Sequence, residues 1–144
     1  MESPHRILLK TIMTKKPYTI NINEPFSDAW DMFKTYDIRH LPVVDDDGIL
    51  KGIVTQRDLY RIQSPRVALE GELLYDRATL DSHILKTVMV KEVFTLLPDD
   101  TLGAAIQAMA RERYGCIPVV DEHKYLVGIV TQANIFKAIA EYFV

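Results

Sequence analysis

The chain has 144 residues, of which 48% are hydrophobic and 26% charged, a composition typical of a soluble globular domain with a sizeable core. A net charge of −3 at pH 7 argues against a nucleic-acid-binding surface. The single cysteine excludes an intrachain disulfide and a cysteine zinc site. We find neither a signal-peptide pattern near the amino terminus nor an apolar run of about 18 residues, so we expect a cytoplasmic protein without a membrane partner.

The sequence matches itself without a gap when it is shifted by 76 positions. When Leu9–Tyr60 is aligned with Leu85–Phe136, 17 of 52 positions are identical. The most similar blocks are Pro42–Asp45 with Pro118–Asp121 and Gly52–Gln56 with Gly128–Gln132. An internal repeat of this length predicts two related structural units, which usually pack about a pseudo-twofold axis.

Each copy begins with a predicted strand followed by a helix. In the first copy, the strand covers residues 18–22, and Asn23 and Pro25 suit the N-cap and first turn of the helix. In the second copy, the strand covers 94–97 and Asp99 is the candidate cap. Apolar residues recur at helical spacing in both copies: Phe26, Ala29, Trp30 and Phe33, and Leu102, Ala105, Ile106 and Met109.

A β-hairpin follows each of these helices. Apolar runs at 41–44 and 49–54 flank a polar turn in the first copy, and runs at 117–120 and 125–130 do so in the second. The acidic turn Asp45–Gly48 lacks the glutamate of a calcium loop, because Gln56 stands at the required position; a solvated turn is the preferred interpretation.

A further helix begins after the second strand of each hairpin. Thr55 and Thr131 are its predicted N-caps, and the helix ends near Tyr60 in the first copy but reaches Ile139 in the second. Residues 61–82 have no counterpart in the repeat. They predict an ordered and partly helical connector.

The repeated motifs resemble those of the cystathionine β-synthase (CBS) domain family. The similarity consists of an apolar residue before Pro-Val-Val-Asp, and Gly-Ile-Val-Thr with an aspartate three residues after the threonine in the first copy. It implies an α/β (α+β) fold of two tandem β-α-β-β-α repeats packed about a pseudo-twofold axis. We therefore expect repeat 1 over 7–62, a connector over 63–82 and repeat 2 over 83–144.

The resemblance also implies a function. Paired CBS domains form a Bateman module, which commonly binds an adenosyl ligand such as AMP, ADP, ATP or S-adenosylmethionine and regulates a neighbouring domain or a partner protein. We expect a non-catalytic sensor of such a ligand, a homodimer and an unidentified effector protein. No catalytic cofactor and no metal site are expected, because the four histidines lack metal-ligand spacing and no nucleophile is paired with a base.

The principal ligand site is expected at Thr55, Arg57 and Asp58. A capping box alone explains the threonine and the aspartate. The resemblance instead implies that Asp58 binds ribose and that Thr55 lies beside the phosphates. By the same resemblance, these residues face a base pocket formed by Val93, Phe94, Tyr114, Cys116 and Ile117.

A weaker site is expected at Thr131 and Asn134. The amide of Asn134 replaces the charged acceptor, and Ala133 replaces Arg57. The resemblance implies that this second site faces Tyr18, Ile38, Arg39 and His40. The arginine and histidine suit a phosphate, although an exposed arginine beside a partly buried histidine is an equally simple explanation.

Two other functions fit the sequence. One is a structural scaffold that dimerises or docks onto an enzyme without binding a nucleotide, which would need only the capping role of Thr55 and Asp58. The other, a catalytic function, has little support.

The expected dimer rests on the apolar surface of the first helix of each copy. The residues that contribute it are Trp30, Met32, Phe33, Tyr36, Ala108 and Met109.

Overall fold

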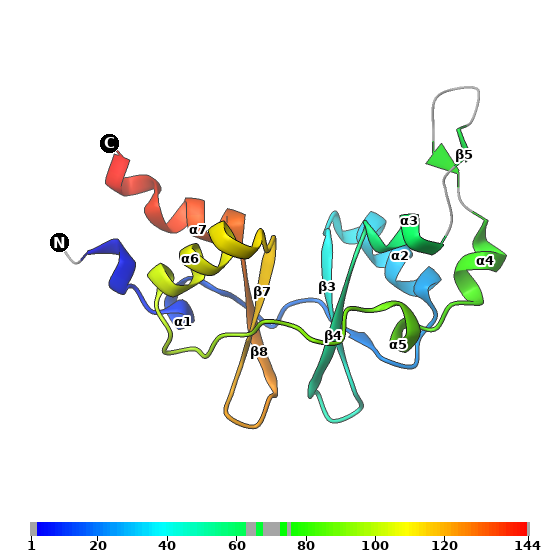
Figure 1. Ribbon diagram of the computed structural model, residues 1–144, viewed down its shortest axis with the longest axis horizontal. Coiled ribbons are helices and arrows are strands. Elements are labelled where there is room, and N and C mark those ends of the chain that lie inside the picture. The colour runs from blue at the N-terminus through cyan, green and yellow to red at the C-terminus, as the bar shows by residue number, and fades with distance from the viewer. Residues whose placement is uncertain (1–2, 63–65, 68–72, 75, 144) are drawn as a thin grey trace. The chain divides into compact units, whose positions relative to one another are not determined.

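The described chain forms two compact units, each with its own hydrophobic core. The structure is a computed structural model and describes residues 3–62, 66–67, 73–74 and 76–143. Unit 1 comprises Met1–Pro17, Gly48–Leu50 and Val93–Val144, and unit 2 comprises Tyr18–Asp47 and Lys51–Glu92. Each unit combines a small sheet with helices (Figure 1), which confirms the expected α+β class. Among the described residues, no helix has the length and apolar content needed to cross a membrane.

Unit 2 is built around a three-stranded sheet in the order β2-β3-β4, with β2 parallel to β3. Its main elements are β2 (Ile20–Asn21), α2 (Phe26–Tyr36), β3 (His40–Val44), β4 (Leu50–Thr55) and α3 (Asp58–Ile62). The apolar stripe of α2 packs in the core, where Phe26 and Phe33 are buried with Leu41 of β3. The first-copy strand, helix and hairpin that the sequence predicts are therefore confirmed.

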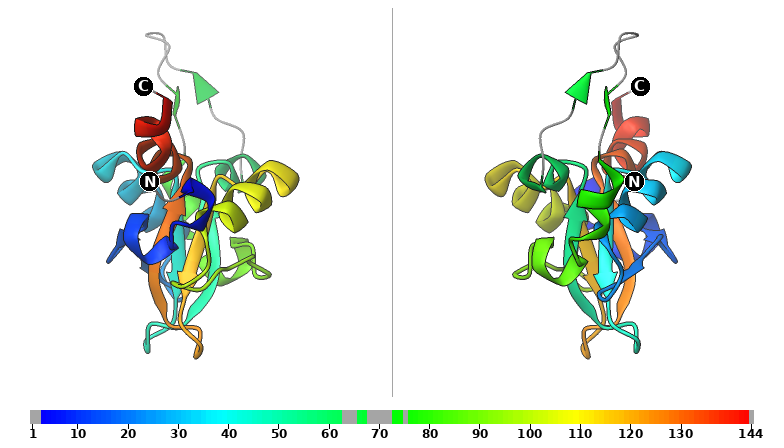
Figure 2. Two further views of the ribbon diagram at one scale, coloured as in Figure 1. Left: turned by 90° about the vertical axis from the view of Figure 1, so that its left-hand side faces the viewer. Right: turned by 90° about the vertical axis from the view of Figure 1, so that its right-hand side faces the viewer.

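Unit 1 contains a sheet in the order β1-β8-β7, with both outer strands antiparallel to β8. Figure 2 shows the hairpin of β7 and β8 in yellow and orange. Its elements are η1 (Pro4–Arg6), α1 (Leu9–Ile12), β1 (Thr14–Lys15), α6 (Leu102–Glu112), β7 (Cys116–Val120), β8 (Leu126–Thr131), α7 (Gln132–Ile139) and η2 (Ala140–Phe143). The second hairpin is confirmed, and Thr131 caps α7 as expected. The strand expected over 94–97 is reduced to one parallel bridge between Leu96 and Val119.

The segment that leads each copy packs in the unit of the other copy. Leu9, on α1, is fully buried in the core of unit 1, and its N–H donates to the Asp100 carbonyl at 2.9 Å. Leu85, on α5 (Leu85–Val88), is buried in the core of unit 2, and its N–H donates to the Glu24 carbonyl at 3.0 Å. The compact units therefore divide the chain differently from the sequence repeats, and the boundaries at 7–62 and 83–144 stay a prediction.

The N-caps of the two long helices differ from those expected. The N-cap of α2 is Pro25 and it makes no side-chain capping bond, whereas Asn23 belongs to a preceding turn in which its N–H donates to Asn21 Oδ1 at 2.9 Å. The N-cap of α6 is Thr101, and its Oγ1 accepts from the Ala104 N–H at 3.2 Å, so Asp99 is not the cap. Both errors place the helix start two residues too early.

The connector contributes to unit 2. Helix α4 (Arg77–Asp81) confirms the expected helical part, and the short strands β5 (Arg66–Val67) and β6 (Leu73–Leu74) pair antiparallel. Leu80 on α4 is buried in the unit 2 core. The Arg77 guanidinium forms two hydrogen bonds, of 2.9 and 2.7 Å, with the carboxylate of Asp31 on α2. Residues 63–65, 68–72 and 75 of the expected connector lie outside the described residues.

The apolar surface on which the dimer expectation rests is smaller than the sequence indicates. Phe33 and Met109 are only 1% and 8% exposed and belong to the two cores, which corrects their assignment to a surface. Trp30 and Met32 are partly buried against the core of unit 2. Tyr36 is 45% exposed, so it retains apolar surface.

Candidate functional site

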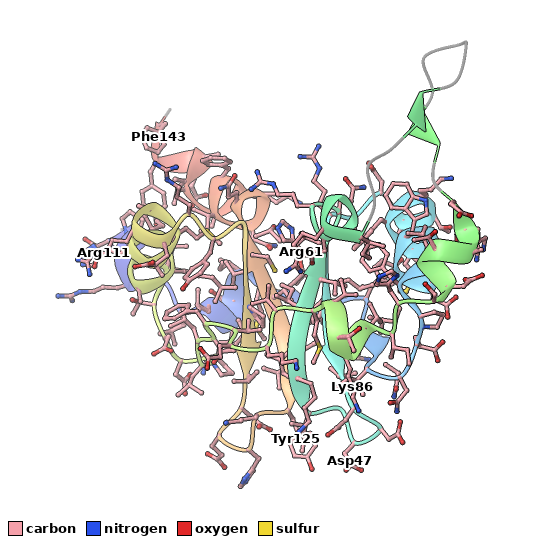
Figure 3. The ribbon with its side chains drawn as sticks, turned by 45° about the vertical axis from the view of Figure 1, so that its right-hand side comes forward. Asp47, Arg61, Lys86, Arg111, Tyr125 and Phe143 are labelled. Carbon is pink, nitrogen blue, oxygen red and sulfur yellow. The ribbon has the colours of Figure 1, made fainter. Side chains whose placement is uncertain are left out.

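Asp58 is a buried carboxylate with identified partners on both oxygens. It opens α3 and is 6% exposed, the only charged side chain in the buried class among residues whose burial is described. Its Oδ2 accepts from the Thr55 N–H at 2.8 Å. Its Oδ1 accepts from Nη2 of Arg61 at 2.5 Å, and the same guanidinium nitrogen lies 2.6 Å from the carbonyl oxygen of Val88 on α5. Figure 3 labels this arginine on α3.

These contacts leave Asp58 with unused acceptor capacity. An ionised carboxylate offers about four acceptor positions, and one protein hydrogen bond on each oxygen uses about half of them. The carboxylate is held in place by a backbone N–H and a guanidinium, so little reorganisation is needed when a further donor arrives. The arrangement can therefore accept two vicinal hydroxyl groups, as the ribose of an adenosyl ligand presents them.

Arg39 and His40 lie next to the turn that joins β4 to α3. The N–H of Gln56 donates to the Arg39 carbonyl at 3.3 Å, which ties the residues following β4 to the start of β3. Burial lowers the pKa of the His40 imidazole below its usual value, and the positive charges of Arg57 and Arg39 lower that pKa further. The sequence assigned Arg57 to one site and Arg39 and His40 to the other, but the structure brings all three together in unit 2.

Two further residues expected at the weaker site also belong to unit 2. Tyr18 is 51% exposed and stacks on Tyr36, with ring centroids 4.1 Å apart and an interplanar angle of 17°. Ile38 packs against the core of the unit. Tyr18 thus offers an accessible aromatic ring, whereas Ile38 already has a packing role.

Asn134 is the unit 1 counterpart of Asp58. Its Oδ1 accepts from the N–H of Thr131 at 2.8 Å and from the Thr131 hydroxyl at 2.9 Å. Its Nδ2 donates to Oγ1 of Thr14, on β1, at 3.2 Å. The amide is therefore a capping group whose oxygen and nitrogen are both engaged, and it has less acceptor capacity than Asp58.

The residues expected to form the base pocket of the principal site belong to unit 1. Phe94 is 39% exposed and stacks on Tyr114, with centroids 5.3 Å apart and planes at 12°. Ile117 is fully buried in the core, and Val93 is partly buried. Cys116 is buried, and burial raises the pKa of its thiol to about 12, so the thiol is neutral and a poor nucleophile at neutral pH.

Sequence reasoning missed three residues that position these groups: Arg61, Tyr36 and Thr14. The spacing of Asp58 and Arg61, three residues apart on a helix, is a signal that could have identified the ion pair. Tyr36 and Thr14 are separated in sequence from the residues they contact. No local pattern identifies them.

Comparison with known proteins identifies the family. The sequence profile of the CBS domain matches residues 9–64 and 85–141. A CBS domain-containing protein of Dictyostelium discoideum is 31% identical over 131 residues, which cover 90% of this chain and 89% of that protein. Homoserine O-acetyltransferase of Methanococcoides burtonii is 33% identical over 89% of this chain, but the chain spans only 23% of that relative.

One of the similar solved structures contains bound ligands. It is the CBS domain pair of protein MJ0100 in complex with 5′-methylthioadenosine and S-adenosyl-L-methionine, which is 26% identical with a TM-score of 0.75. The alignment covers 94% of this chain and 97% of that chain. The profile matches and the tandem sequence repeat agree on two copies. The chain therefore belongs to the CBS domain family and carries two CBS domains in tandem.

Proposed function

We propose that this CBS domain pair is a non-catalytic sensor that binds an adenosyl ligand, of the AMP, ADP, ATP or S-adenosylmethionine type, and regulates a partner protein. The observation that carries the proposal is the buried carboxylate of Asp58, which is fixed by Thr55 and Arg61 and retains acceptor capacity. Family membership supports the ligand class, since the CBS pair of MJ0100 was crystallised with two adenosyl compounds.

In the proposed principal site, both ribose hydroxyls donate to Asp58. Bonds from these hydroxyls to a charged acceptor are about twice as strong as bonds between neutral groups. The base contacts Val93, Phe94, Tyr114, Cys116 and Ile117, as the family resemblance implies. The Phe94–Tyr114 pair supports this part of the proposal, because the 39% exposed ring of Phe94 offers an aromatic face to a base.

Regulation follows from the ordering effect of the ligand. A ligand that is bound more tightly by one conformation shifts the population toward it and changes the surface that a partner protein contacts. We propose that the protein acts as a homodimer on an effector protein, and that Thr131 and Asn134 form a second, weaker site.

One observation favours the alternative, a scaffold that binds no nucleotide. Asp58 accepts hydrogen bonds from Thr55 and Arg61, so its burial is compensated without any ligand. A scaffold would keep this network as a capping device that joins α3 to α5 through the Val88 carbonyl.

Mass spectrometry of small molecules released from the purified and denatured protein separates the two functions. The sensor predicts an adenosyl compound in near-stoichiometric amount, or calorimetric titration with adenosyl compounds that saturates near one per chain. A blank extract together with no heat from AMP, ADP, ATP or S-adenosylmethionine would leave the scaffold as the function.

A further inference from the structure

We propose that Arg61 is a positioning residue that couples ligand binding at Asp58 to the backbone of residues 88–90. When ribose hydroxyls occupy the carboxylate, this arginine holds the Val88 carbonyl more firmly and orders the segment that leads to the base-binding residues. The coupling to a ligand rests on the proposed function, whereas the restraint on residues 88–90 is supported by its own contacts.

One nitrogen of Arg61 joins the carboxylate to this segment (Figure 3). Nη2 donates to Oδ1 of Asp58 at 2.5 Å and to the carbonyl oxygen of Val88 at 2.6 Å. The arginine side chain is 58% exposed, so these two bonds fix the guanidinium more than burial does. A new donor at Asp58 changes the arginine's interaction with the carboxylate, and the same nitrogen transmits that change to Val88.

The segment after Val88 pairs with β4 through an isolated bridge. The N–H of Ile53 donates to the Val90 carbonyl at 3.1 Å, and the N–H of Val90 donates to the Ile53 carbonyl at 3.0 Å. Val90 is 46% exposed. A short and exposed pairing opens more readily than a continuous strand ladder, so its opening can respond to the restraint on Val88. Phe94, which the proposed function assigns to the base, follows Val90 by four residues.

Unit 1 contains an equivalent connection that is built from different residues. Asn134, the counterpart of Asp58, donates from Nδ2 to Oγ1 of Thr14 at 3.2 Å. Thr14 is the counterpart of Val90 in the repeat. The side chain at this position is therefore tied to the equivalent segment in both copies, directly in unit 1 and through Arg61 in unit 2. A connection that recurs with different chemistry indicates a role beyond the capping of one helix.

Amide hydrogen exchange of the ligand-free full chain tests the restraint. Arg61→Met should raise the exchange rates of the Val90 and Ile53 amides about tenfold, the effect of losing a hydrogen bond to a charged group. Methionine keeps an unbranched stem and offers no donor. Arg61→Gln repeats the test with a polar but uncharged side chain. Unchanged rates would overturn the restraint, as would an equal rise at Phe33 within α2, because that would indicate a general loss of stability.

Lys137→Met is the matched control. Lys137 is the counterpart of Arg61 in the repeat and is exposed on α7. Across the residues that the structure describes, it forms no ion pair. Its replacement removes one positive charge from the chain and should leave the exchange rates at Val90 and Ile53 unchanged.

The same measurement with AMP tests the coupling. At a concentration of about ten times its Kd, AMP should slow exchange at Val90 and Ile53 about tenfold in the wild type, because opening then requires release of the ligand. In Arg61→Met, AMP at the same multiple of that variant's own Kd should leave these rates unchanged. Calorimetry should show that Arg61→Met weakens AMP and adenosine binding by the same factor of about ten, since the arginine acts through the ribose acceptor. A loss confined to AMP would place Arg61 on the phosphate and overturn the positioning role.

The outcomes separate this inference from the proposed function. If AMP binds and slows exchange equally in the wild type and in Arg61→Met, the function stands and the coupling is wrong. If no adenosyl compound binds the wild type, the proposed function is wrong and the coupling to a ligand falls with it. The ligand-free comparison then still decides whether Arg61 restrains residues 88–90.

Discussion

Asp58 and Asn134, which are equivalent positions of the two copies, accept the same backbone hydrogen bond. The N–H of Thr55 donates to the carboxylate and the N–H of Thr131 to the amide oxygen, each at 2.8 Å. This backbone bond is thus common to both copies, while the negative charge is present only in the first. This relationship allows capping and ligand binding to be separated by mutation.

Asp58→Ala should weaken adenosyl binding by about 1.5 to 3 kcal/mol, the range for hydrogen bonds to a charged group. Its effect on stability should be limited to a capping contribution of about 1 kcal/mol. Arg61, which loses its partner, has a side chain that is 58% exposed and can be solvated. Asp58→Asn is the matched control, because Asn134 shows that an amide keeps the backbone bond. Titration calorimetry measures the change in affinity, and urea unfolding measures the change in stability. An unchanged affinity would mean that Asp58 has only a capping role.

Asn134→Asp should strengthen the second site. The wild-type chain should bind one ligand tightly and a second much more weakly, because the amide oxygen of Asn134 carries no full charge and already accepts two bonds from Thr131. The hydroxyl of Thr14, which now accepts from the Asn134 amide, can rotate to donate to a carboxylate. The stoichiometry in calorimetry should rise toward about two per chain in the variant. Two equal sites in the wild type would contradict the prediction.

His40 should make the protein less stable at acidic pH. Its pKa is lowered in the folded state, first by burial and then by Arg57 and Arg39, so the unfolded chain binds a proton more readily near pH 6.5 and below. The free energy of unfolding should therefore fall as the pH drops through the ordinary pKa of 6.5 toward the lower folded value. Well above pH 6.5, the contribution of His40 to the free energy of unfolding no longer changes with pH.

His40→Gln isolates that effect. The variant should lose part of the decline in stability between about pH 7.5 and pH 5.5, the range in which an imidazole titrates. The comparison uses the difference between variant and wild type, so titration of the other three histidines cancels. Urea unfolding at several pH values gives the measurement. Parallel curves for the two proteins would show that His40 does not couple to folding.

The sequence predicted the elements better than their assignment to units. Hydrophobic spacing and the repeated motifs located both hairpins and both long helices, because these features depend on local periodicity. The sequence could not show that α1, which begins the first copy, packs in unit 1, or that α5, which begins the second copy, packs in unit 2. Leu9 and Leu85 are identical, as are Met13 and Met89, so either segment fits either core. Tertiary packing decides which core each segment joins, and the hydrophobic periodicity within one copy does not indicate that choice.

The candidate site was also predictable only in part. The position of Asp58 after Thr55 could be inferred from the motif, and the spacing of Asp58 and Arg61 on one helix indicates their ion pair. The grouping of Arg39, His40 and Arg57 depends instead on how β3 lies beside the turn after β4. Charges that are distant in sequence meet through strand pairing. The resemblance assigned them column by column and could not anticipate that contact.

We expect a twofold dimer that includes Trp30 or Met32 and residues of α6. Ile106, the counterpart of Trp30, is 37% exposed, and burial of a large apolar side chain contributes roughly 1.5 to 3 kcal/mol. Light scattering at micromolar concentration should give twice the chain mass, and Ile106→Glu should shift the protein toward monomer. Phe136→Glu, at a 65% exposed position on α7, is the control. A monomer mass for the wild type, unchanged by ligand, would exclude the dimer.

Gly52→Ala should be more destabilising than the equivalent Gly128→Ala. A Cβ at Gly52 would lie 2.5 Å from Sδ of Met89 and 2.7 Å from the carbonyl oxygen of Val90. That carbonyl accepts from the Ile53 N–H at 3.1 Å, so it cannot move without breaking a backbone bond. Overpacking of this kind costs about 1 to 3 kcal/mol, which urea unfolding detects readily.

At Gly128 the conflict is mainly with a flexible side chain. A Cβ there would lie 2.6 Å from Sδ of Met13 but 3.0 Å from the nearest backbone oxygen, that of Thr14. Adding Met13→Ala should therefore offset much of the loss caused by Gly128→Ala, whereas adding Met89→Ala should offset little of the loss caused by Gly52→Ala, since the Val90 carbonyl stays in place. The two double-mutant cycles measure this difference as a coupling energy, which should be about 1 kcal/mol or more at Gly128 and smaller at Gly52. Equal couplings would mean that the methionine, and not the backbone, limits the space at both glycines.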